Sequence, residues 1–151
     1  MLSENMNAPD FELEGSDGKK HNLKEFKGKT LVLYFYPKDN TPGCTVEAKN
    51  FNKSLDEIRA LKAEVVGVSK DDLKSHEKFC GKYSLNFLFL SDPESKMIKS
   101  YDAYGDRGIF GMGTLRKTLI IDKNGKVVKI FEKVKPDKHD KEVLDVLKTI
   151  K

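Results

Sequence analysis

Cys44 is the residue of this chain whose type and position best suit covalent chemistry. It follows Thr41, Pro42 and Gly43, which come shortly after the apolar run 31–36. Thr41 suits the N-cap of a helix and Pro42 its first position, so we expect Cys44 in the first turn. There, unpaired backbone N–H groups and the positive end of the helix dipole favour a thiolate. The pattern predicts a reactive cysteine; the alternative is a small, inert core side chain.

A helix is expected to begin at this cysteine. Apolar side chains recur at intervals of four and three residues, as they do on one face of an α-helix. These side chains are Cys44, Ala48, Phe51, Leu55 and Ile58. We therefore predict a helix from Cys44 to about Lys62, with the thiol at the top of the core-facing stripe and partly sheltered from water.

The elements that must position this helix follow from hydrophobic period and turn residues. We expect an extra N-terminal hairpin at 11–23, strands at 31–36, 64–69, 86–90, 117–122 and 126–132, and helices at 71–83, 94–101 and 138–150. Helical connections imply parallel strands with helices on both faces, whereas the turn at 122–125 makes the last two strands antiparallel. The prediction is an α/β, thioredoxin-like fold, a mixed central sheet flanked by helices. The Gly-rich segment 104–115 is expected to be a mobile loop.

Composition limits the class of protein. With 151 residues, 38% of them hydrophobic, the chain is expected to form a single domain, 1–151. Its net charge of +4 comes from lysines interspersed with acids, which argues against a nucleic-acid site. No apolar stretch approaches the ~20 residues of a membrane span, and residues 1–6 lack a signal-peptide pattern. We expect a cytoplasmic protein without a membrane partner, where two cysteines favour a catalytic disulfide over a structural one.

Five segments together resemble one protein family. They are Ala8–Phe11, Tyr34–Thr45, Leu90–Pro93, Arg116 and Thr118–Gly125. In this order they are similar to the peroxiredoxins of the Q type, also called bacterioferritin comigratory proteins. The resemblance implies an enzyme that reduces hydrogen peroxide and small organic hydroperoxides without a metal, haem or flavin. It also implies thioredoxin or a similar thiol reductant as partner, and a monomer.

The resemblance assigns roles to four residues around the predicted helix start. Cys44 would be the peroxidatic cysteine, Thr41 and Pro37 would shape its pocket, and Arg116 would converge on the sulfur. Peroxide reduction needs an anionic nucleophile and donors aimed at developing negative charge. An arginine serves both needs through its planar fork, whereas a lysine offers only a point charge.

Cys80 is the second cysteine, and its role has two interpretations. In many Q-type relatives the resolving cysteine lies five positions after the peroxidatic one, but Lys49 stands there in this chain. Others carry it on the following helix, and Cys80 fits that pattern. We expect it to resolve the sulfenic acid after local unfolding, because the two thiols lie on separate helices. Otherwise Cys80 is an ordinary half-buried thiol and an external thiol resolves Cys44.

Other classes of thiol protein fit the sequence less well. A disulfide exchanger needs Cys-x-x-Cys, but Thr41 and Glu47 occupy the positions three residues from Cys44. A glutathione-peroxidase-like enzyme would be expected to use glutamine and tryptophan, and the chain contains neither. A noncatalytic redox-sensing module of the same fold stays open as an alternative.

The three histidines offer two further possibilities. A Cys-His hydrolase would need His21, His76 or His139 beside Cys44, and we expect surface or core roles for all three. A metal site built from His76, Cys44 and Cys80 would lack a fourth ligand with recognisable spacing.

Overall fold

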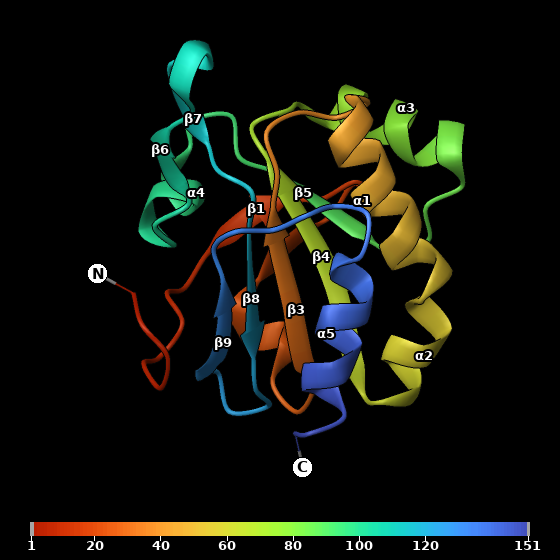
Figure 1. Ribbon diagram of the computed structural model, residues 1–151, viewed down its shortest axis with the longest axis vertical. Coiled ribbons are helices and arrows are strands. Elements are labelled where there is room, and N and C mark those ends of the chain that lie inside the picture. Colours follow the sequence, from red (N-terminus) through yellow and green to blue (C-terminus); the bar gives the residue numbers. More distant parts are fainter. Residues whose placement is uncertain (1, 151) are drawn as a thin grey trace.

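A five-stranded mixed sheet lies at the centre of the computed structural model, which describes residues 2–150 (Figure 1). Its strand order is β5-β4-β3-β8-β9. The strands are β1 (Glu12–Glu14), β2 (Lys20–Asn22), β3 (Thr30–Phe35), β4 (Ala63–Ser69), β5 (Leu88–Ser91), β6 (Tyr104–Asp106), β7 (Met112–Thr114), β8 (Lys117–Ile121) and β9 (Val127–Phe131). The helices are η1 (Leu23–Phe26), α1 (Pro42–Lys53), α2 (Leu55–Ala60), α3 (Leu73–Tyr83), α4 (Lys96–Ser100), η2 (Gly108–Phe110) and α5 (His139–Leu147).

Strand β3 is the middle strand and fixes the geometry of the site. All six of its residues are buried, as expected for a strand covered on both faces. It pairs in parallel with β4 and antiparallel with β8, in a register that sets Phe35 opposite Lys117. The residue before β8, Arg116, therefore lies beside the carboxyl end of β3. The mixed sheet predicted from the sequence is confirmed.

Helices cover both faces of this sheet, as predicted. Because successive side chains of a strand point to opposite faces, β3 contributes to two apolar clusters. Val32 and Tyr34 pack in one cluster with side chains of α1, α2, α3 and α5, whereas Leu31 and Leu33 pack with α4 and the N-terminal segment. Figure 1 shows the same division, with α4 on the side away from α1 and α5.

The single helix predicted from Cys44 to Lys62 is wrong in one respect, because the chain forms two helices, α1 and α2. They are separated at Ser54, whose hydroxyl donates to Asp140 Oδ2 at 2.6 Å, near the start of α5. Backbone hydrogen bonds continue across this junction, because Ser54 N–H donates to Asn50 O and Ile58 N–H donates to Ser54 O, both at 3.0 Å. The core-facing stripe survives this break, since each of its five apolar residues is buried.

Two hairpins flank the sheet. The predicted N-terminal hairpin is present as β1 and β2, with Leu13 opposite His21. The segment expected to be a loop at 104–115 is instead an antiparallel hairpin of β6 and β7. Its turn is possible because Gly108 and Gly111 adopt positive φ angles of 67° and 72°. None of the helices within residues 2–150 is long and apolar enough to cross a membrane.

Candidate active site

Cys44 lies in the first turn of α1, directly beyond the carboxyl end of β3. The chain leaves the sheet at Tyr36, passes the half-buried Pro37 and enters the helix at Pro42. The cysteine is only 1% exposed, so its sulfur is more sheltered than the sequence indicated. A small substrate must therefore reach it through a narrow opening or a local movement.

Thr41 occupies the N-cap position, as predicted, but its side chain does not cap the helix. Its hydroxyl donates to the Lys38 carbonyl at 2.8 Å and so closes the preceding loop. The helical hydrogen-bond ladder begins where Thr45 N–H donates to Thr41 O at 2.8 Å. The N–H groups of Gly43 and Cys44 precede that ladder and lie at the positive end of the helix dipole, next to the thiol.

Arg116 reaches Cys44 from the segment between β7 and β8. Its Nη2 donates to Cys44 Sγ at 3.4 Å, so the structure brings together the two residues that the resemblance paired. Gly43 makes room for this contact, because a Cβ there would lie 3.1 Å from Arg116 Nη2. A larger residue at this position would require the guanidinium to shift by a few tenths of an ångström.

Glu47 is a member of the site that sequence reasoning missed. Its side chain is 1% exposed, and its Oε1 accepts a hydrogen bond from Arg116 Nη1 at 2.7 Å. Burial raises the pKa of Glu47 to about 7, against the opposing charge of Arg116. Its spacing of three residues from Cys44 was the available signal, because such residues are neighbours on a helix. Arg116 is thus fixed at both ends of its fork.

Cys80 lies in α3 and is half-buried. Both cysteines are free thiols. Cys80 lines a pocket of about 440 Å³ together with residues of the N-terminal hairpin and β5, and Cys44 does not belong to that wall. Burial raises the pKa of Cys80 to about 11, so this thiol is protonated near neutral pH. Cys80 takes no part in the hydrogen bonds that join Arg116 to Cys44 and Glu47.

The three histidines are engaged away from Cys44. His21 bonds Asp17 and Glu25, His76 bonds a buried carboxylate, and His139 bonds Thr118 Oγ1 at 2.7 Å. No group of three potential metal ligands occurs among the described residues. The site therefore contains the Cys44 thiol, the Arg116 guanidinium and the Glu47 carboxyl, and among the described residues no histidine bonds any of the three.

A sheltered cysteine at a helix start, contacted by an arginine beside a thioredoxin-like mixed sheet, defines the class of thiol-dependent peroxidases. Comparison with known sequences agrees with this class. The profile of the AhpC/TSA family matches residues 5–130, and the chain belongs to that family. Within it, the relatives are peroxiredoxins of the Bcp and Q type, and the protein is a thiol-dependent peroxidase.

Three relatives illustrate the similarity. A putative peroxiredoxin Bcp of Helicobacter pylori is 47% identical over 143 residues, covering 93% of this chain and 94% of the relative. Peroxiredoxin Bcp of Bacillus subtilis is 45% identical over 144 residues, covering 93% and 92%. The solved bacterioferritin comigratory protein of Xanthomonas campestris, studied for its alkyl peroxide reduction activity, superposes with a TM-score of 0.88 at 36% identity, covering 92% and 90%.

Proposed function

We propose that Cys44 is the peroxidatic residue of this peroxidase. The observation that carries the proposal is the contact of Arg116 Nη2 with Cys44 Sγ at 3.4 Å, made to a cysteine that is itself buried. The thiolate attacks one peroxide oxygen, the S–O bond forms and the O–O bond breaks. The other oxygen leaves as hydroxide or alkoxide and takes up a proton, so Cys44 becomes a sulfenic acid.

Arg116 stabilises the thiolate and the negative charge that develops on the leaving oxygen. A guanidinium suits this task because its several N–H groups point in fixed directions. Glu47 acts as a positioning residue, since its 2.7 Å hydrogen bond holds one arm of the fork while the other faces the sulfur. Thr41 and Pro37 shape the pocket; Pro37 has no N–H, so its contribution is to shield the site and bend the chain.

Cys80 resolves the sulfenic acid. Its sulfur attacks Cys44 Sγ, the S–S bond forms, the S–O bond breaks, and hydroxide leaves with the thiol proton as water. Thioredoxin or a similar dithiol then reduces this disulfide. The protonated state of Cys80 in the closed fold supports a sequence in which α3 first opens and exposes this thiol. If Cys80 does not resolve Cys44, an external thiol must do so.

The substrates are hydrogen peroxide and small organic hydroperoxides. The alkyl peroxide reduction studied in the Xanthomonas relative supports the second group. We further propose that residues 1–151 act as one domain and as a monomer, in the cytoplasm, with neither nucleic acid nor membrane as partner. Sedimentation of the reduced protein measures its oligomeric state, and a dimer would contradict this part of the proposal.

A substitution series tests the residue roles. Steady-state peroxide consumption with thioredoxin is measured for the wild type, Cys44→Ser and Thr45→Ser, the last being a matched change beside the cysteine. Serine cannot supply an anionic nucleophile near neutral pH, so Cys44→Ser is expected to be inactive and Thr45→Ser active. Peroxide consumption by Cys44→Ser at the wild-type rate would refute the assignment.

A further inference from the structure

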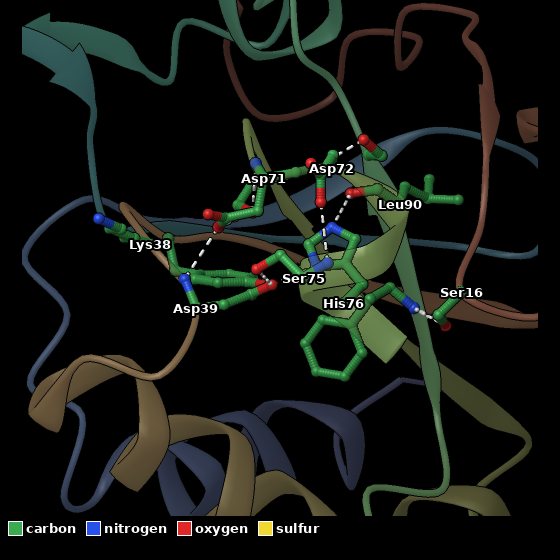
Figure 2. A network of polar contacts seen from close by, with 12 residues as sticks. Ser16, Lys38, Asp39, Asp71, Asp72, Ser75, His76 and Leu90 are labelled. Atoms are coloured by element: carbon green, nitrogen blue, oxygen red, sulfur yellow. Dashed lines mark hydrogen bonds and ion pairs between the residues drawn. The ribbon is translucent and has the colours of Figure 1, made fainter. Parts of the chain in front are cut away.

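A buried ion pair outside the peroxide site joins the segments that carry the two cysteines (Figure 2). His76 Nδ1 donates to Asp39 Oδ2 at 2.6 Å, and the two side chains are 0% and 2% exposed. Asp39 lies in the loop between β3 and α1, and His76 lies in α3. Nothing in the chemistry of Cys44, Arg116 and Glu47 uses this pair.

The hydrogen-bond geometry defines the charge of this pair. His76 Nε2 lies 2.9 Å from the Leu90 carbonyl, which can only accept, so this nitrogen carries a proton. Nδ1 faces a carboxylate oxygen and donates as well. The same carboxylate accepts from the Tyr36 and Ser75 hydroxyls, a set of donors that suits the ionised form. The pair is therefore an imidazolium and a carboxylate whose side chains are buried in the closed fold, although Asp39 and Ser75 also line a pocket of about 520 Å³.

The position of the pair matters for motion. Asp39 comes five residues before Cys44, and His76 comes one helical turn before Cys80. The next loop residue, Asn40, accepts hydrogen bonds from Lys82 and Tyr83 at the other end of α3, but these contacts are exposed. The loop before the peroxidatic cysteine thus contacts α3 at both ends, and of these contacts the one between Asp39 and His76 is buried.

We propose that the Asp39–His76 ion pair is a latch that holds α3 closed and sets how fast Cys80 reaches the Cys44 sulfenic acid. The inference rests on the proposed resolving role of Cys80. Opening α3 far enough for disulfide formation separates His76 from Asp39 and exposes both charges to water. The latch therefore prolongs the lifetime of the sulfenic acid, during which excess peroxide can overoxidise Cys44.

The latch is expected to weaken as pH rises. Burial alone would lower the pKa of His76, but its hydrogen bond to Asp39 and the charges of Asp39 and Asp71 raise that pKa above its ordinary value of 6.5. The charged groups that act on the ring are Asp39 and Asp71, and its Nε2 bonds the Leu90 carbonyl. Because the pKa of His76 is higher in the folded than in the unfolded protein, the ion pair stabilises the closed fold fully below pH 6.5. This stabilisation is lost as pH rises through the folded pKa of His76.

The test measures disulfide formation after one equivalent of hydrogen peroxide. The chain has no tryptophan, so the reaction is followed by rapid acid quench and intact mass. His76→Gln and Asp39→Asn are each expected to speed conversion of sulfenic acid to disulfide by roughly 10- to 100-fold, the effect of losing a hydrogen bond between charged groups. The double variant should add little to either single variant, because both remove the same pair.

The pH dependence provides a readout that a general packing defect would not give. The rate of disulfide formation in His76→Gln, divided by that of the wild type, should be largest near pH 6. This ratio should fall as pH rises, because His76 of the wild type then loses its charge and the variant has no such group to lose. His139→Gln is the matched control, since His139 is equally buried but bonds Thr118 and Glu142 instead. It should leave the rate of disulfide formation unchanged.

Each outcome bears on a different part of the mechanism. Unchanged rates in His76→Gln and Asp39→Asn, a pH-independent ratio, or equal acceleration in His139→Gln would overturn the latch. Failure of the wild type to form any Cys44–Cys80 disulfide would instead refute the resolving role of Cys80. The two failures are therefore distinguishable in the same mass spectra.

Discussion

Replacing Arg116 by lysine tests whether the geometry of the arginine, and not only its charge, serves the reaction. Arg116 makes two directed contacts, at 3.4 Å to Cys44 Sγ and at 2.7 Å to Glu47 Oε1. A lysine ammonium is a single point on a flexible stem and cannot occupy both positions. The buried Glu47 keeps a nearby positive charge in this variant, so the fold is expected to stay intact.

The size of the effect follows from the removal of one hydrogen-bond donor from the site. One preorganised donor to a developing negative charge contributes about 10²- to 10³-fold in rate. Because the ammonium will bind the closer carboxylate of Glu47, we expect the variant to lack a donor to sulfur and peroxide. The rate constant for the first reaction of Arg116→Lys with hydrogen peroxide should fall about 10²-fold.

The assay is single-turnover oxidation followed by rapid quench, with thermal unfolding of each variant as a check on the fold. Arg59→Lys is the matched control, because Arg59 also uses its fork, bonding Glu64 and the Asn86 carbonyl, but in α2. It should react at the wild-type rate. Wild-type kinetics in a folded Arg116→Lys protein would refute the reasoning and show that a positive charge without the planar fork is sufficient.

The same site supports three further predictions. Cys80→Ser should reduce the first equivalent of peroxide normally but lose thioredoxin-coupled turnover and overoxidise more readily; full turnover would make Cys80 a bystander. Gly43→Ala should slow the first step, because its Cβ would lie 3.1 Å from Arg116 Nη2, and unchanged kinetics would argue against this crowding. Glu47 has a pKa of about 7 in the folded protein, raised from 4.5, so its ionisation opposes folding. The free energy of unfolding of the wild type, measured in urea, should therefore fall relative to that of Glu47→Gln as pH rises from 4.5 to 7. A difference between the two proteins that does not change with pH would contradict this prediction.

The sequence predicted those parts of the site that depend on local pattern. Pro42 and the apolar stripe are local signals, and they placed Cys44 in the first turn of a helix. The mixed sheet with its antiparallel last pair could be predicted because helical connections and a tight turn restrict how strands pair. The position of Arg116 came from resemblance, and the register between β3 and β8 supplies its physical reason.

The parts that could not be predicted depend on contacts between distant segments. Glu47 reads as an exposed helix residue, because a glutamate is rarely buried without a partner, and its partner is 69 residues away. The Asp39–His76 pair joins residues 37 positions apart, so no local period reveals it. The junction of α1 and α2 at Ser54, whose hydroxyl bonds Asp140 of α5, also has no local signal, because the apolar stripe continues through it.

The Cys44–Cys80 cycle is tested by the intact mass of the reduced wild-type protein after one equivalent of hydrogen peroxide. We expect a product two hydrogens lighter than the reduced chain, with Cys44 and Cys80 joined in one peptide pair after digestion. In Cys44→Ser the mass should stay unchanged under the same conditions. A wild-type product that retains an added oxygen, or oxidation of Cys44→Ser at the wild-type rate, would contradict the account.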